Sequence, residues 1–87
     1  MTRETIIEFP TEFPVKALGR DKPEFKNTVI ELITVHAEFD QQADVKIQPS
    51  SKGNFISVTV TFKAESQEQL DNIYQSLHDH ELVLMVF

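Results

Sequence analysis

The chain has no cysteine, only two glycines and no long apolar run among its 87 residues. Without cysteine it can form no disulfide, bind no metal through a thiolate and use no thiol nucleophile. No segment approaches the 18 consecutive apolar residues of a membrane-spanning helix. The first residues, "MTRETIIEFPTEFP", contain acidic residues and prolines where a signal peptide has an apolar run. We therefore expect a protein of the cytoplasm that does not enter the membrane.

Positive charge is also scarce, because eight lysines and arginines face fourteen aspartates and glutamates and leave a formal net charge of −6. The averaged field of such a chain repels phosphate backbones and anionic lipid headgroups. The sequence holds no run of basic residues that would offset this field locally. We therefore expect neither nucleic acid nor a membrane surface as a partner.

The length allows one domain, spanning residues 1–87. A domain of this size buries roughly 60–65% of the surface that its unfolded chain exposes, which is enough for one two-layer core. Two aromatic-proline pairs, Phe9-Pro10 and Phe13-Pro14, stand near the start. A residue before proline is pushed out of the helical region, so residues 1–12 are predicted to form an extended N-terminal lead-in.

The first half of the chain predicts a strand, a helix and a strand. Residues 13–19, "FPVKALG", alternate loosely and end at a glycine, which is typical of a strand followed by a turn. Asp21 has the position of a helix cap, and Pro23 suits a first helical turn. Apolar residues then recur at helical spacing, so a helix is expected to end near Glu38 or Phe39. Residues 44–48 alternate again, and Pro49 ends the strand.

The second half predicts a strand, a helix and a strand. Residues 56–64 alternate between apolar and polar side chains without a break, which is the clearest two-residue period in the chain. Ser66 and Gln69 form a capping box, and apolar residues at helical spacing carry the helix to about His78. The segment 81–87, "ELVLMVF", is too short for a typical helix and predicts a buried final strand.

This order of elements predicts an α+β fold. Two right-handed βαβ crossovers, intercalated in this order, give the ferredoxin-like βαββαβ two-layer sandwich. Its sheet has four antiparallel strands, and both helices lie on one face. Whichever alternate residues of the final strand face the helices, apolar side chains such as Met85 and Phe87 or their neighbours face away. The N-terminal phenylalanines, a ligand or a second copy in a homodimer would cover them.

Three segments resemble a known family. They are "EFPTEFPVKALG", "QPSSKGNFISVTVTF" and the apolar final strand, and together they resemble the YbeD-like family of small bacterial proteins of unknown function. The resemblance spans essentially the whole chain. It implies a ferredoxin-like fold similar to ACT regulatory domains, which in other proteins bind small metabolites such as amino acids at subunit or domain interfaces. It also implies a lean towards regulation, although fold alone does not define function.

The segment "PSSKGN" has two interpretations, as a binding loop or as a turn. Serine hydroxyls, successive backbone amides and a lysine would suit a carboxylate or a phosphate. Alternatively, Gly53 supplies a positive φ, and the serines and Asn54 bond to nearby backbone in a hairpin turn. We favour the turn and keep as candidate ligand- or partner-binding residues Ser50, Ser51, Lys52, Gly53 and Asn54.

A catalytic alternative uses Arg20 with Asn54, as in acylphosphatases, which share this fold and use an arginine and an asparagine. The glycine-rich loop that holds the substrate there has no counterpart in "LGRDKP". His78 and His80 are adjacent to acidic residues, but their spacing matches no standard metal motif, and histidines are favoured near a helix C-terminus. We therefore expect no catalytic residue, no metal and no cofactor.

The sequence thus predicts a non-enzymatic regulatory or adaptor module. We expect it to bind a protein partner or a small metabolite through its sheet face or an edge strand. A small hydrolase of the acylphosphatase type is the alternative, and acetyl phosphate turnover would separate the two.

Overall fold

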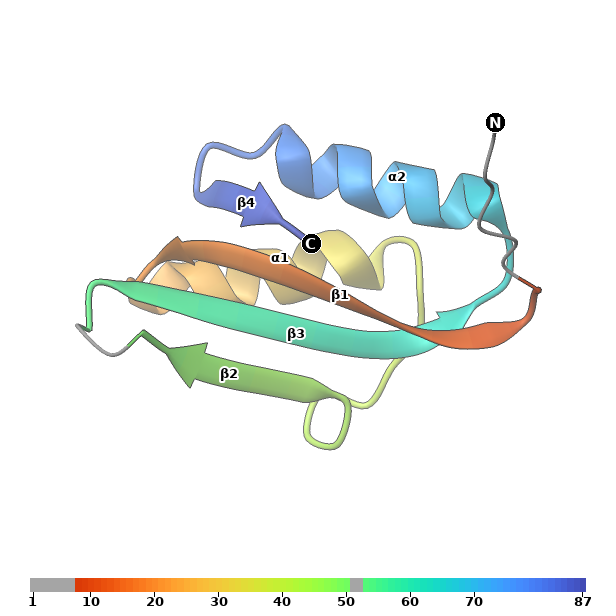
Figure 1. Cartoon of the computed structure of the whole chain (residues 1–87), viewed down its shortest axis with the longest axis horizontal. Helices are drawn as coiled ribbons and strands as arrows, with labels where there is room; N and C mark the ends of the chain where they lie inside the picture. The colour runs from red at the N-terminus through yellow and green to blue at the C-terminus, as the bar shows by residue number, and fades with distance from the viewer. Residues whose placement is uncertain (1–7, 51–52) are drawn as a thin grey trace, which may run out of the picture.

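The computed structural model describes residues 8–50 and 53–87. Its helices and strands follow the predicted order (Figure 1): β1 (Thr11–Arg20), α1 (Pro23–Thr34), β2 (Val45–Pro49), β3 (Phe55–Ala64), α2 (Gln67–His78) and β4 (Val83–Val86). No helix in these two ranges is long and apolar enough to cross a membrane.

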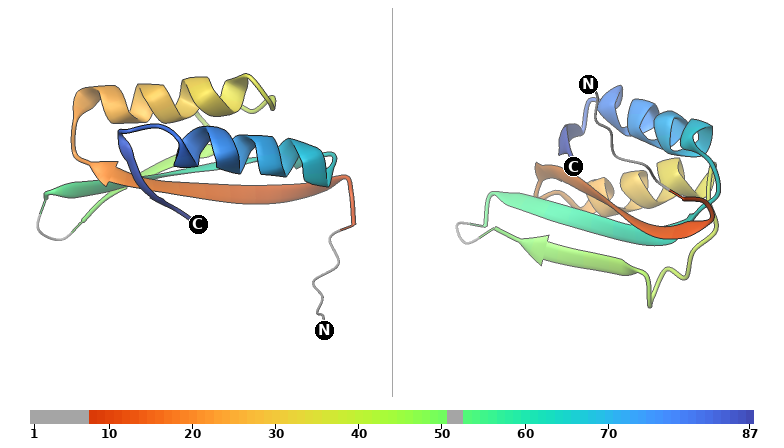
Figure 2. Two further views of the ribbon diagram at one scale, coloured as in Figure 1. Left: turned by 90° about the horizontal axis from the view of Figure 1, so that it is seen from above. Right: turned by 45° about the vertical axis from the view of Figure 1, so that its right-hand side comes forward.

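The four strands form one antiparallel sheet in the order β2-β3-β1-β4. Both helices lie on the same side of this sheet, as the view from above in Figure 2 shows. The predicted ferredoxin-like sandwich is therefore confirmed. Within residues 8–50 and 53–87 no helix lies on the opposite side of the sheet, and we call that side the open face.

The hydrophobic core fills the space between the sheet and the helices. Side chains alternate along a strand, so Val15 and Ala17 of β1 are fully buried while Lys16 between them is exposed. Each helix adds one apolar stripe. The largest fully buried side chains are Phe25, Ile33, Leu70, Ile73, Leu77, Val15, Val29, Val58 and Val60. Because these residues fix which side of each strand faces inward, they also fix the composition of the open face.

The start of α1 differs from the prediction. Lys22, not Asp21, occupies the cap position, and its side chain makes no capping hydrogen bond. Lys22 has the extended backbone of a cap residue, and Pro23 then begins the helix. The proline fixes the first helical residue one position later than an Asp21 cap would require.

The end of α1 was also predicted wrongly, by about one turn. The helix ends at Thr34, whose hydroxyl donates to the carbonyl oxygen of Ile30 at 2.6 Å. Beyond this point the chain turns, and Ala37 enters the core as the loop towards β2 begins. The helical spacing of apolar residues therefore continues past Thr34, because residues of the following loop pack on the same core. This made the helix look longer in the sequence than it is.

α2 begins as predicted. The Ser66 hydroxyl accepts the backbone N–H of Gln69 at 3.1 Å, and the helix runs to His78. The Gln69 side chain reaches back and accepts the backbone N–H of Glu65 at 2.7 Å. This reciprocal arrangement resembles a capping box, in which the second bond would come from the N–H of the cap residue Ser66. Here it comes from Glu65, one residue earlier.

The final strand is shorter than predicted and contains an irregularity. Gly19 pairs with Val83, but Leu18 pairs with Met85, so Leu84 is an extra residue on β4. This bulge lets Val83 and Val86 both contact the core, although a regular strand would place them on opposite faces. Met85 and Phe87 consequently project to the open face.

The N-terminal segment joins the fold earlier than expected. β1 begins at Thr11, so the last two residues of the predicted lead-in belong to the sheet. Phe9 and Phe13 are partly buried and pack against the core. They therefore do not cover the apolar residues of β4 that point to the open face, because Phe13 faces the helices together with Val15.

Candidate functional site on the open sheet face

The open face faces the viewer in Figure 1, where the sheet lies in front of the helices. On β1 it carries Lys16, Leu18 and Arg20, which alternate with the buried core residues. On β4 it carries Met85, which pairs with Leu18, and Phe87, which follows the strand. The surface is therefore a mixture of basic and apolar side chains.

A transverse row of three residues crosses the centre of this face. Thr59 of β3 pairs with Lys16 of β1 on one side and with Lys46 of β2 on the other. Paired residues of antiparallel strands point to the same face, so the two lysine side chains leave the sheet on either side of Thr59. We call Lys16, Thr59 and Lys46 the basic row.

Phe87 extends this row at the β4 end. Its backbone N–H donates to the carbonyl oxygen of Lys16 at 2.7 Å, and the N–H of Lys16 donates back at 3.2 Å. The Lys16 Nζ atom lies 5.7 Å from the centre of the Phe87 ring, within the range of a cation–π contact. The aromatic ring therefore sits beside the basic row without neutralising its charge.

The position of Phe87 is supported from α2. The Tyr74 hydroxyl donates to the carbonyl oxygen of Phe87 at 3.2 Å. Partial burial removes water from this phenol and raises the pKa of Tyr74 above its usual value. The neutral phenol thus remains the donor, and it ties the end of the chain to the helix layer.

A second cation–π contact lies farther along the same face. The Arg20 Cζ atom is 5.6 Å from the centre of the Phe55 ring, and the two residues pair across β1 and β3. Between this contact and the basic row lie Leu18 and Met85. Met85 and Phe87 are 52% and 55% exposed, which leaves an apolar strip open to solvent.

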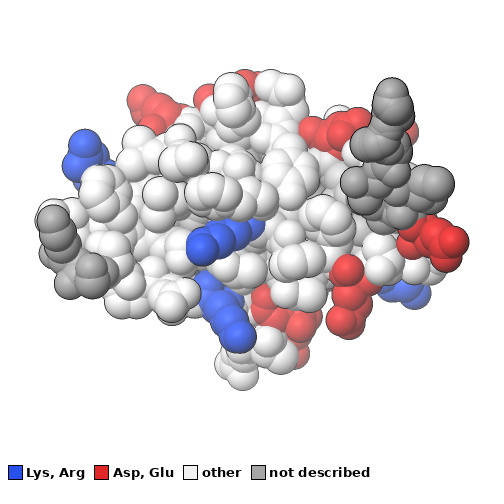
Figure 3. Space-filling model, in the orientation of Figure 1, with Lys and Arg blue, Asp and Glu red and all other residues white. Residues whose placement is uncertain are grey.

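The charge of this surface is opposite to that of the whole chain. The four strands carry four cations against one carboxylate, Glu12, whereas the chain has a formal net charge of −6. Figure 3 shows two basic side chains side by side near the middle of the open face, with acidic side chains towards its rim. Within residues 8–50 and 53–87, no carboxylate lies within 4.0 Å of the Lys16 or Lys46 ammonium group. These two cations are available to a partner.

The predicted loop site lies at one end of the sheet. The Ser50 N–H donates to the carbonyl oxygen of Phe55 at 2.9 Å, and the Ser50 hydroxyl accepts the Phe55 N–H at 3.3 Å. Gly53 has a φ of 74°, as the turn interpretation requires. Ser51 and Lys52 lie outside the described residues. The segment is thus closed as a turn, and anion binding there stays a prediction.

The proposed catalytic pair does not form a recognisable active site. Arg20 stacks on Phe55, and the backbone carbonyl of Asn54 accepts the N–H of Asp21 at 3.2 Å. The loop after β1 leads directly into Pro23 and α1, and its sequence lacks the glycine-rich loop of the acylphosphatases. Both residues instead make contacts that join β1 to β3 at one end of the sheet.

The histidines do not gather into a metal site. His78 and Asp79 are 3.8 Å apart at the end of α2, where both are exposed. The ring of His80 accepts the backbone N–H of Leu82 at 3.1 Å, and His36 lies 3.3 Å from the Ser76 hydroxyl. In the part of the chain that the structure describes, no three potential ligands lie close enough to hold a metal ion.

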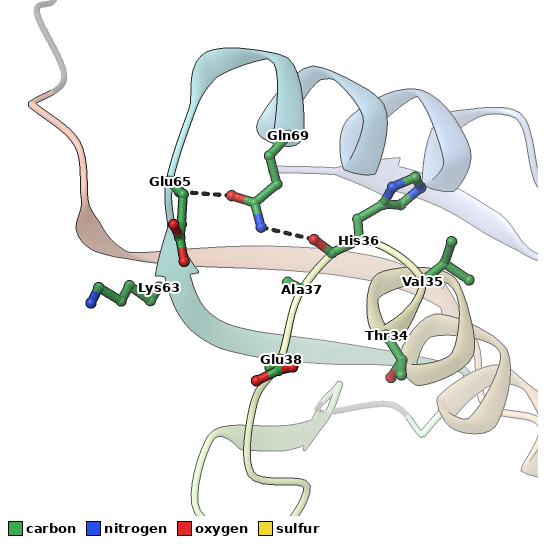
Figure 4. A pocket seen from close by; sticks show the side chains of 8 residues that line it. All are labelled: Thr34, Val35, His36, Ala37, Glu38, Lys63, Glu65 and Gln69. Atoms are coloured by element: carbon green, nitrogen blue, oxygen red, sulfur yellow. Dashed lines mark hydrogen bonds between the residues drawn. The ribbon is translucent and has the colours of Figure 1, made fainter.

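A cavity lies between the end of α1 and the start of α2, and no residue of the basic row lines it (Figure 4). It is an open space of about 620 Å³, lined by Thr34, Val35, His36, Ala37, Glu38, Lys63, Glu65 and Gln69. The Gln69 amide donates to the carbonyl oxygen of His36 at 2.8 Å and accepts from Glu65. The Gln69 side chain therefore links the segment after α1 to the segment before α2.

Comparison with known proteins identifies the family. The model of a family described as "Protein of unknown function (DUF493)" matches residues 4–87. The chain belongs to this family. A UPF0250 protein of Neisseria gonorrhoeae is 48% identical over 84 residues, which cover 97% of this chain and 92% of the relative. A UPF0250 protein of a Janthinobacterium species is 41% identical over 83 residues, which cover 95% and 91%. The predicted resemblance to the YbeD-like family is confirmed.

Solved structures share the fold at low sequence identity. The solution structure of protein HP0495 from H. pylori has a TM-score of 0.73 at 17% identity and covers 99% of this chain and 90% of that one. The crystal structure of the ACT domain from the GTP pyrophosphokinase of Chlorobium tepidum has a TM-score of 0.60 at 19% identity, with 88% and 97% covered. These matches establish an ACT-like fold for this member of the family, and they give the acylphosphatase alternative no support.

Proposed function

We propose that this chain is a non-enzymatic regulatory or adaptor module that binds a protein partner through its open sheet face. The observation that carries the proposal is the composition of that face. An apolar strip containing Met85 and Phe87 is exposed beside two lysines whose ammonium groups have no carboxylate within 4.0 Å among the described residues. Exposed apolar patches rimmed by polar residues mark interaction sites, and methionine and aromatic residues are enriched in them.

The open face suits a protein better than a small metabolite. Small molecules bind in concave sites that bury most of their surface. Three cavities of the described residues lie at the helix ends, beside the β1–α1 turn and against α2, and none of these three is lined by the basic row. A partner that contacts Lys46 on β2 and Phe87 beyond β4 must span the whole width of the sheet, which a protein surface can do.

The structural similarity to an ACT domain supports a module without catalysis of its own. That similar domain is part of a GTP pyrophosphokinase, so a sandwich of this kind occurs as one component of a larger enzyme. Fold similarity leaves the partner undefined, and the surface must identify it. The proposal also keeps the cytoplasm as the place of action, which fractionation of native cells would test.

Site-specific photocrosslinking in native lysate tests the proposal. A photoreactive amino acid would replace Met85 on the open face in one variant, and Val35 on the helix side in the matched control, since Val35 is 77% exposed. We expect a discrete adduct from position 85 and none from position 35. Adducts of equal yield from both positions, or from position 35 alone, would contradict binding through the open face.

A further inference from the structure

We propose that the partner presents an acidic segment, one carboxylate of which is bound over Thr59 between Lys16 and Lys46. This inference rests on the proposed function, because it names the chemistry of the partner that the open face receives. The carboxylate lies within the basic row, and an adjacent apolar side chain of the partner packs on Leu18, Met85 and Phe87.

The separation of charge within the molecule supports an acidic partner. Cations exceed carboxylates by three on the strands, whereas α1 and α2 each have more acidic than basic residues. The net charge of −6 therefore lies in the helix layer and the loops, and the open face is a positive surface on an acidic protein. An acidic segment is attracted to this surface and repelled by the rest of the molecule, which orients the encounter.

The geometry of the basic row suits one carboxylate. Neighbouring strands lie about 4.8 Å apart, so the Cα atoms of Lys16 and Lys46 are separated by roughly 10 Å across β3. A carboxylate above Thr59 is within reach of both flexible lysine side chains, and the threonine hydroxyl can donate a hydrogen bond from below. It would also relieve the repulsion between two ammonium groups on one surface. Charge-assisted hydrogen bonds of this kind are stronger than neutral ones.

The surroundings of the row define the second element of recognition. Phe87 adjoins Lys16 through paired backbone hydrogen bonds, and Met85 and Leu18 form the next transverse row. A partner whose carboxylate lies on the basic row therefore places its neighbouring side chains on this apolar strip. We expect the partner's segment to contain an acidic residue next to an apolar one. An acidic residue alone would leave the apolar strip uncovered, and an apolar residue alone would leave the basic row without a counter-charge.

Two other occupants fit the surface less well. A second copy stacked face to face would oppose lysines to lysines, which is unfavourable. Nucleic acid would find no aromatic side chains at the centres of β1 and β3, where the open face carries Lys16, Leu18, Ser57 and Thr59.

Chemical-shift mapping of backbone amides with synthetic peptides tests the inference. The first probe is a peptide of alternating glutamate and phenylalanine, and its control has glutamine in place of every glutamate. We expect the glutamate peptide to shift the amides of Lys16, Lys46 and Thr59, and the glutamine peptide to shift them much less. Binding should weaken as salt is raised, because screening reduces the attraction between exposed charges.

Two charge variants provide the matched comparison. Lys16→Met with Lys46→Met removes both charges of the row while keeping apolar stems, and should weaken binding of the glutamate peptide by about tenfold. Lys22→Met with Lys26→Met removes the same charge from exposed positions at the start of α1 and should change affinity little. Melting temperatures of both variants would show that each is folded.

The outcomes separate this inference from the proposed function. If both peptides shift the open face equally, or the Lys16→Met/Lys46→Met variant binds as the wild type does, the acidic partner is wrong while the binding face stands. If no peptide binds and position 85 gives no photoadduct, both are wrong. Stronger shifts with oligodeoxythymidylate than with the glutamate peptide would show that the face binds nucleic acid instead of an acidic partner. Shifts that depend on protein concentration without any peptide would show that it binds a second copy of the chain.

Discussion

At Gly19 the backbone of β1 passes so close to its neighbours that no side chain fits. A Cβ atom there would clash with the Phe25 ring and lie 2.7 Å from the backbone carbonyl oxygen of Leu82. The carbonyl belongs to the turn before β4 and cannot move aside as a side chain can. We expect Gly19→Ala to lower the free energy of unfolding by about 1–3 kcal/mol, because the overpacked site must shift β4 or α1. Urea denaturation measures it, and a loss below about 0.5 kcal/mol would show that the site has more room.

Gly53 is the matched comparison, because its constraint is in the backbone alone. Its φ is 74°, and a Cβ atom there would meet nothing within 4 Å. Gly53→Ala should therefore cost about 1–2 kcal/mol through the left-handed backbone, with no disturbance of packing. The same urea experiment applies, and unchanged stability would mean that the turn can adopt another conformation. The sequence alone predicted this glycine's role, whereas the crowding at Gly19 depends on tertiary contacts that a sequence pattern does not contain.

Asp40 makes the fold sensitive to acid in the loop before β2. One of its carboxylate oxygens, Oδ1, accepts the backbone N–H groups of Gln42 at 2.8 Å and Ala43 at 3.0 Å. The bond from Ala43 and then that from Gln42 lower the pKa of Asp40 below its usual value, since they stabilise the charged form. A lowered pKa in the folded state contributes stability above the unfolded pKa, and this contribution is lost as pH falls through the folded pKa. A carboxyl-carbon NMR titration should place the midpoint below the usual pKa of an aspartate carboxyl. A midpoint at or above that value would show that these hydrogen bonds are absent in solution.

At the scale of elements, the two helix starts offer a test of capping. The Ser66 hydroxyl accepts the Gln69 N–H, whereas Lys22 occupies the equivalent position of α1 without any side-chain bond. Ser66→Ala should therefore reduce the free energy of unfolding by about 0.5–2 kcal/mol. Lys22→Ser should raise it by about 0.5–1 kcal/mol, because it adds an acceptor to a backbone already in the extended cap conformation. Thermal or urea unfolding of both variants checks the pair, and effects of the same sign would contradict it.

Most helices and strands could be predicted from the sequence, because each buries one side and its apolar residues therefore recur at a regular spacing. The alternation from 56 to 64 and the Ser66 capping box indicated β3 and α2 within one residue. The end of α1 was not readable, since Ala37 packs on the same core after the helix has ended. The bulge at Leu84 was not readable either, because a local irregularity changes the face of every later residue, and only the pairing with β1 reveals it.

At the scale of the whole molecule, the binding surface is a consequence of register. Taken singly, Lys16 and Lys46 have the pattern of solvated strand positions, and they are separated in sequence by all of α1. Pairing with Thr59 from either side brings them together, and no local pattern encodes that pairing. The sequence-based candidates at 50–54 depended on residue types that suit a ligand and also suit a turn. The composition of the sheet face, by contrast, required knowing which strand lies next to which.

The register also bears on self-association, which stays a prediction. A face-to-face dimer would bring together the basic rows of two copies, so we expect it to be suppressed at low ionic strength. The outer edge of β2 is unpaired within the sheet and is a more favourable contact between copies. Sedimentation velocity at low and high salt measures this. A dimer that forms at low salt and is unaffected by a proline at Ile47 of β2 would contradict an edge contact.

The most direct test of the open face as the binding surface is the methyl resonance of Met85 in native lysate. The chain has two methionines, Met1 and Met85, so protein labelled at methionine methyl groups gives two signals, and Met85→Leu assigns them. We expect the Met85 signal to shift or broaden in lysate. It should recover in lysate that has first been passed over immobilised unlabelled protein, which removes the partner. A Met85 signal that is unchanged in lysate from which the protein demonstrably captures a partner would show that binding occurs elsewhere.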